Sequence, residues 1–153
     1  MALVLPLMLA ITLGFIGVMI EMRAQSEFQT AVDLAAQAAV VPPLGDAAGS
    51  LADAQYAFDH TLNPVGGESS FLTVTTPLAC SGPYLEGQVP LSPDGLPAPA
   101  PVTCSATAEL NLGASPVGIL WFWTAQLSAT SEVQPSAYRG CQSGATSSAC
   151  QPS

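Results

Sequence analysis

Four cysteines, Cys80, Cys104, Cys141 and Cys150, are the residues of this 153-residue chain best suited to covalent chemistry. None lies in a CxxC pair, the spacings do not fit a zinc site, and His60 is the only histidine, so a metal site is disfavoured. Four cysteines allow three connectivities. We expect Cys80–Cys104 to staple a hairpin across a Pro-rich loop and Cys141–Cys150 to close the C-terminal tail.

Catalytic chemistry has little support in the sequence. His60 stands alone near the end of an expected helix, where a histidine is usually a surface or capping residue. The chain has no Gly-rich phosphate loop, no nucleophile elbow and no pair of basic residues that would hold an anion. Pro93-Asp94-Gly95 is typical of a turn and not of a calcium loop. We therefore expect a protein that is not an enzyme and that has no cofactor.

Two other groups could mediate contacts between molecules. We expect Arg23 to meet an acid, either Glu27 in the same helix or Glu21 or Glu27 of a neighbouring copy. The alternative is a solvated surface pair, which contributes little. Trp121-Phe122-Trp123 is a conspicuous aromatic patch. It is expected to pack against the chain's own helices or the next subunit, and the alternative is an exposed adhesive or membrane-interface patch.

The composition excludes several functional classes. The chain carries 11 acidic residues against two arginines and no lysine, a formal net charge of −9. No basic face can be built for nucleic acid or for docking on anionic lipid. Hydrophobic residues make up 49% of the chain and its mean hydropathy is +0.43, so it would collapse instead of staying disordered.

The apolar residues are concentrated in an N-terminal helix expected over residues 1–41. Residues 1–20 carry no charge and as a helix would span about 30 Å, the thickness of a bilayer core. Residues 21–41 extend it as an Ala-rich amphipathic stalk, which Pro42-Pro43 and Gly45 end. A cleaved signal peptide is the rival interpretation, but the basic n-region is absent and the helical pattern continues.

The remainder predicts an α+β body over residues 42–133 and a Ser- and Gly-rich tail over 134–153. Asp46 caps a second helix whose stripe is formed by Leu51, Ala54, Ala57, Phe58 and Leu62. Strands are expected over 71–78, 102–112 and 119–133, with a Pro-rich loop over 81–101, so the body is one helix against an antiparallel sheet of about three strands. The cysteines favour an oxidising compartment, which places the body outside the cytoplasm.

The N-terminal helix resembles that of TadE-like pilins, the type IV pilin-like subunits of tight-adherence (Tad) pili. The similarity covers residues 1–41 and is looser in the body, at 102–112 and 124–133. The matching features occur in the family's order: Leu5-Pro6-Leu7, Gly14, Ile20-Glu21-Met22-Arg23, Phe28-Gln29-Thr30-Ala31 and the Ala-rich turn 35–39. The family's precursor has a basic leader and a Glu at the fifth mature position, whereas this chain has Leu5. Either a leader and a few mature residues precede Met1, or this subunit lacks that Glu.

The resemblance implies a structural subunit that is held in the inner membrane and then polymerises with copies of itself into an extracellular pilus for surface attachment or motility. It also implies a pilus assembly platform and a prepilin peptidase as partners. Small residues in the helix would let neighbouring helices approach closely, and Pro6 would kink it or cost little. The expected filament-core residues are Pro6, Ala10, Gly14, Gly17, Phe28, Ala31 and Ala35. The alternatives are a minor, membrane-retained pilin that primes assembly or acts at the tip, and an anchored exodomain with an unknown ligand.

Overall fold

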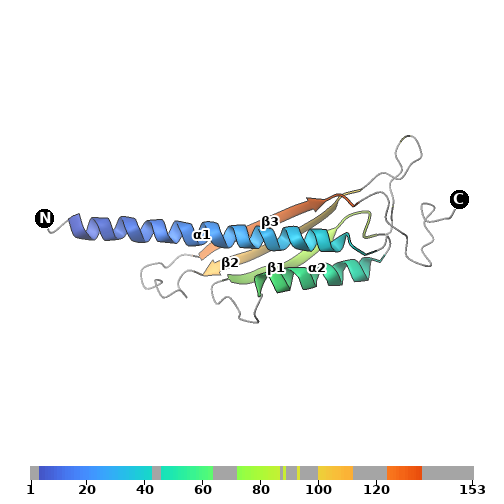
Figure 1. Ribbon diagram of the computed structural model, residues 1–153, viewed down its shortest axis with the longest axis horizontal. Coiled ribbons are helices and arrows are strands. Elements are labelled where there is room, and N and C mark those ends of the chain that lie inside the picture. Colours follow the sequence, from blue (N-terminus) through green and yellow to red (C-terminus); the bar gives the residue numbers. More distant parts are fainter. Residues whose placement is uncertain are drawn as a thin grey trace.

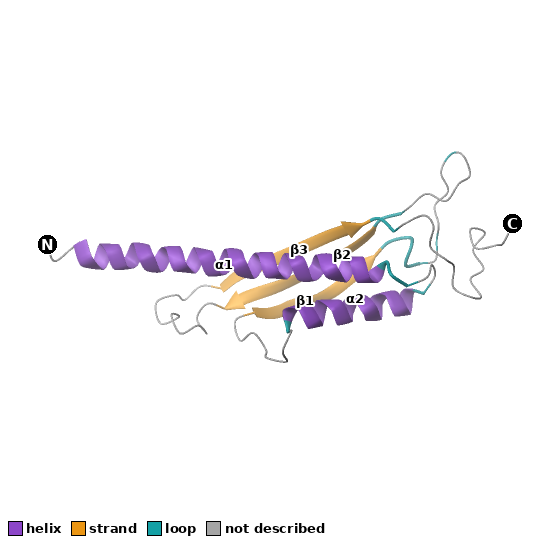
Figure 2. Cartoon of the chain, in the orientation of Figure 1, coloured by secondary structure: helices purple, strands orange, loops and turns teal. Residues whose placement is uncertain are grey.

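A computed structural model gives the chain an α+β fold, with a long apolar helix, a second helix and a three-stranded antiparallel sheet (Figures 1 and 2). It describes residues 4–42, 46–63, 72–86, 88, 93, 100–111 and 124–135. The elements are α1 (Val4–Ala39), α2 (Ala47–Leu62), β1 (Leu72–Ser81), β2 (Val102–Asn111) and β3 (Thr124–Val133). The fold class expected from the sequence is therefore confirmed.

Helix α1 ends at Ala39, two residues before the predicted end. The N–H of Val40 donates to Gln37 O and that of Val41 to Ala38 O, at 3.3 and 3.0 Å, so the last turn tightens. Pro42 has no N–H to continue the ladder, and a proline disfavours the helical conformation of the residue before it. The predicted stop is correct, and the tightened turn explains the offset.

Helix α2 begins where the sequence predicts. Asp46 is the N-cap, and its Oδ1 accepts a hydrogen bond from the N–H of Gly49 at 3.0 Å. The buried stripe differs from the expected one: Leu51 is exposed, and Ser50, Ala54 and Phe58 are buried at a spacing of four. A small hydroxyl residue takes the place expected for leucine because α2 packs closely against the alanine-rich part of α1.

The sheet has the order β1-β2-β3, with β2 in the centre. The register of β2 on β3 is unbroken from Val102↔Val133 to Asn111↔Thr124, whereas β1 pairs with β2 through two irregularities. Alternate β2 residues face the core, as the period of a strand requires: Val102, Cys104, Ala106, Ala108 and Leu110. The third strand is described from Thr124, so residues 119–123 of the predicted strand lie outside the described residues.

Both helices lie on one side of the sheet, and the strands run alongside the C-terminal half of α1 (Figure 1). Phe28 of α1 and Phe58 of α2 meet edge to face with ring centroids 6.0 Å apart. The alanines of α1 let α2 and the sheet approach its backbone. The C-terminal half of α1 is thus part of the body's hydrophobic core, so the boundary drawn at residue 41 divides elements that share one core.

The predicted disulfide between Cys80 and Cys104 is present, and the two residues face each other directly in the register of β1 and β2. The chain then turns at Gly82, whose φ of +155° favours glycine and where a Cβ would lie 2.5 Å from Pro101 O. Tyr84 follows, and its hydroxyl donates to Pro42 O at 2.9 Å. This loop therefore ties the end of β1 to the end of α1. Cys141 and Cys150 lie outside the described residues.

Candidate assembly surface

The N-terminal half of α1 extends beyond the body (Figure 1). Large apolar side chains are exposed along this part of the helix. Of the sixteen exposed large hydrophobic residues in the described parts of the chain, eleven lie between Val4 and Met22, which we call the projecting segment. Leu5 is 70% exposed and Phe15 65%. The members are Val4, Leu5, Leu7, Met8, Leu9, Ile11, Phe15, Ile16, Val18, Met19 and Met22. So long an apolar surface favours lipid or other protein over water.

Helix α1 is long and apolar enough to cross a membrane. Its 36 residues correspond to about 54 Å, against about 30 Å for a bilayer core. The uncharged residues up to Ile20 account for most of one bilayer, and Phe28 is the first fully buried residue of the body. The arrangement is consistent with a single-pass membrane protein.

Two glycines lie in the projecting segment, at the positions where close helix packing was predicted. A Cβ added to Gly14 would meet nothing within 4 Å, so no packing contact in the subunit's own fold demands a glycine there. A glycine in a helix costs about 0.5–1 kcal/mol relative to alanine, so this choice destabilises the isolated helix. Gly17 is buried. Pro6 and Ala10 lie in α1, but their side chains are outside the described parts.

The structure places three other predicted filament-core residues inside the subunit itself. Phe28, Ala31 and Ala35 are at most 1% exposed and pack in the chain's own core. Each of them lies on the face of α1 that α2 and the sheet cover. Their apolar pattern is thus explained by the body, and most of the exposed apolar surface of α1 lies N-terminal to them.

Among the acids expected to pair with Arg23, the structure shows Glu27 of the same helix. Arg23 Nε donates to Glu27 Oε1 at 2.9 Å, and the two side chains are 82% and 64% exposed. The pair is therefore the solvated surface pair that was the alternative expected from the sequence. The arginine lies N-terminal to the acid, which is the less favourable order for the helix dipole. Glu21 is half-buried and has no ion-pair partner among the residues that the structure describes.

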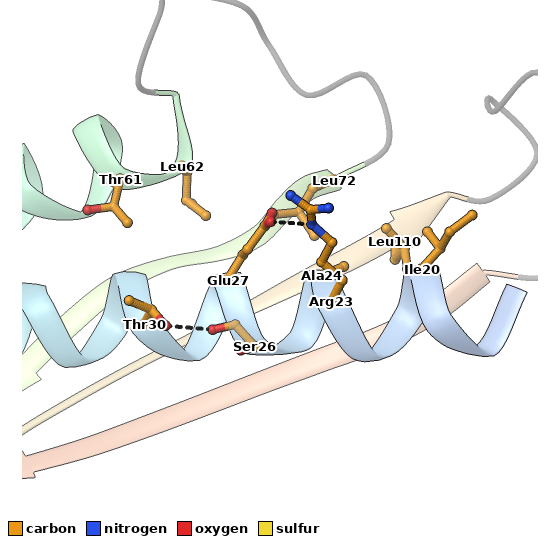
Figure 3. A pocket seen from close by; sticks show the side chains of 10 residues that line it. All are labelled: Ile20, Arg23, Ala24, Ser26, Glu27, Thr30, Thr61, Leu62, Leu72 and Leu110. Atoms are coloured by element: carbon orange, nitrogen blue, oxygen red, sulfur yellow. Dashed lines mark hydrogen bonds and ion pairs between the residues drawn. The ribbon is translucent and has the colours of Figure 1, made fainter. Parts of the chain in front are cut away.

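An open groove of about 500 Å³ lies where the projecting segment meets the body (Figure 3). Its floor is apolar, and its rim carries the Arg23–Glu27 pair together with Ser26, Thr30 and Thr61. The rim hydroxyls of Thr30 and Thr61 donate to backbone carbonyls within their own helices. The floor residues come from four elements: Ile20, Ala24, Leu62, Leu72 and Leu110.

The groove suits an apolar occupant and offers no reactive constellation. The part of the chain that the structure describes has no group of three or more His, Cys, Asp or Glu residues that could hold a metal. Sequence reasoning missed this groove, because its floor combines residues of α1 with leucines at the ends of α2, β1 and β2, which are far apart in the sequence. Trp121, Phe122 and Trp123, the expected contact patch, lie outside the described residues.

Comparison of the chain with protein-family models, with curated proteins and with solved structures returned no match.

Proposed function

We propose that this chain is a structural subunit that polymerises through α1 into an extracellular type IV pilus, similar to a Tad pilus, used in attachment or motility. The observation that carries the proposal is the projecting segment, an apolar helix that is uncharged up to Ile20 and extends beyond a body with a hydrophobic core of its own. A helix of this kind can be buried in lipid before assembly and among other helices after it.

Gly14 supports helix packing in the assembled state. The glycine weakens the isolated helix and relieves no contact within the subunit. Small residues allow helix backbones to approach closely, and this is their usual role where helices associate in an apolar environment. Assembly of projecting segments into a filament core gives Gly14 that role.

The body would coat the filament. Residues 42–153 carry eight acidic residues and one arginine, a net charge of −7. A net charge of this size would keep the outer surface of the filament hydrated and soluble. The Cys80–Cys104 disulfide supports a body outside the cytoplasm, where disulfides persist. The further partners of the chain would be a prepilin peptidase, which processes it, and a pilus assembly platform in the inner membrane.

The test is electron microscopy of fibres sheared from cells that express the chain, with mass spectrometry of their main component. We expect fibres whose principal protein is this chain, with its disulfide intact. Recovery of the chain only as a trace component would identify a minor pilin and overturn the role of repeating subunit. Fibres that form equally well after the gene is deleted would overturn a role in the filament altogether.

A further inference from the structure

The groove at the foot of the projecting segment is continuous with one apolar face of α1. Leu9, Leu13, Ile16 and Ile20 recur at spacings of four, three and four, so they share a face of the helix. Ile20, the last of them, also lines the groove (Figure 3). A rod laid along this face would therefore run into the space between α1, the end of α2 and the start of β1.

The lining defines the chemistry of the occupant. The floor is aliphatic and is formed by Ile20, Ala24, Leu62, Leu72 and Leu110. The only charges on the lining are Arg23 and Glu27, which neutralise each other. A charged ligand finds no uncompensated partner there, and an anionic lipid headgroup would approach a chain of net charge −9. The groove is suited to an uncharged apolar rod.

Such a rod is present on every copy of the chain, because residues 1–20 contain no charged side chain. We propose that the groove receives the projecting segment of a second copy, which lies along Leu9–Ile20 and ends its contact over Ala24 and Leu72. This inference rests on the proposed polymerisation and adds to it the place on the body where the neighbouring helix is held.

The proposed site explains why the projecting segment and the body are joined without a linker. Because Ile20 and Ala24 belong to the same rigid helix, a neighbour seated in the groove fixes the body of one subunit relative to the helix of the next. Contacts made this way replace lipid with packed side chains, and close van der Waals packing is what favours the association of helices that come from a bilayer.

The first experiment fills the groove. Ala24→Phe should lower the yield of fibres by about tenfold or more, the change that follows when each contact loses roughly 1.4 kcal/mol. The matched control is Gln25→Phe, which adds the same ring to the neighbouring, exposed position of α1 that does not line the groove. The control should assemble normally. Equal yields from the two variants would overturn the proposal.

The second experiment identifies the occupant of the groove directly and does not rely on blocking it. The photoreactive residue p-benzoylphenylalanine replaces Thr61 on the rim, and the modified subunit is mixed into fibres with ¹⁵N-labelled wild type. Arginine occurs only at positions 23 and 139 and lysine is absent, so trypsin leaves the whole apolar segment on one peptide that ends at Arg23, which we call peptide 1–23 after the residues it carries. We expect the modified subunit to be crosslinked to a ¹⁵N-labelled peptide 1–23.

The outcomes separate this inference from the proposed function. Fibres that contain the chain but give crosslinks only to unlabelled peptide 1–23, to lipid or to another protein would overturn the groove assignment and leave polymerisation standing. Absence of wild-type fibres would overturn both. A crosslink between labelled and unlabelled copies, together with the loss caused by Ala24→Phe, would establish the site.

Discussion

Gly14 lies at a position where the isolated subunit and the proposed filament favour different side chains. Within the subunit, a side chain at this position meets no neighbour within 4 Å and would improve the helix. In a packed bundle of helices the same side chain would separate two backbones. One substitution should therefore change folding and assembly in opposite directions.

We predict that Gly14→Leu leaves membrane insertion intact, raises helicity slightly and reduces fibre yield by about tenfold or more. Insertion is measured by membrane fractionation and assembly by recovery of sheared fibres. The control is Val18→Leu, a change between large residues at an exposed position of the same segment. Normal fibres from Gly14→Leu would contradict close packing at this glycine.

Phe58 tests the core at the same scale. Its side chain is 1% exposed and packs edge to face on Phe28, so Phe58→Ala should lower the free energy of unfolding by about 3–5 kcal/mol. Tyr56→Ala removes an aromatic ring that is 69% exposed on the same helix and should cost far less. Both values are measured by denaturant titration in detergent. Similar costs for the two variants would show that α2 does not pack as described.

At the scale of elements, β1 is the strand least secured by its neighbours. It lies at an edge of the sheet, its pairing with β2 contains two irregularities, and most of its residues are exposed. The disulfide to the central strand compensates by holding β1 in register near its C-terminal end. The covalent link should consequently carry a large share of the stability of this hairpin.

We predict that combining Cys80→Ala with Cys104→Ala lowers the free energy of unfolding by about 3 kcal/mol, as expected for a crosslink that closes a loop of this length. The measurement is the shift in denaturant midpoint relative to wild type. A thiol reductant should lower the wild-type midpoint similarly and affect the double variant much less. An unchanged midpoint in the double variant would show that β1 is held by its non-covalent contacts.

At the scale of the whole molecule, α1 serves two structures. From Phe28 onward it contributes to the core of the body, and up to Met22 most of its large side chains are exposed. The two roles are separated along the helix and meet in the short stretch that lines the groove. The body should thus fold without the projecting segment.

We predict that a chain beginning at Glu21 is monomeric in solution without detergent and keeps a cooperative thermal transition, because the buried core residues lie C-terminal to that point. Size-exclusion chromatography and circular dichroism measure these properties. The same chain should neither insert into membranes nor enter fibres. Aggregation or loss of the transition would show that the projecting segment is needed to complete the fold.

Much of this architecture was predictable because its signals are local. The charge-free run before Glu21, the cap at Asp46 and the alternation along Val102–Asn111 each specify an element through neighbouring residues alone. The Cys80–Cys104 pair followed from placing Cys80 just after the first expected strand and Cys104 within the second. The assignment of Phe28, Ala31 and Ala35 to a filament core was not supported, because an apolar stripe shows that a face is buried and does not show what buries it.

The sequence by itself determined that the chain has a helix too hydrophobic to remain exposed to water, an acidic body and an α+β order of elements. These features follow from composition and from the periodicity of apolar residues, both of which can be counted along the chain. Only the tertiary structure decided where along α1 the body ends, which side chains remain free, and that Leu62, Leu72 and Leu110 meet Ile20 and Ala24 in one groove. These facts depend on packing between elements far apart in the chain, and no local pattern encodes which distant surfaces meet.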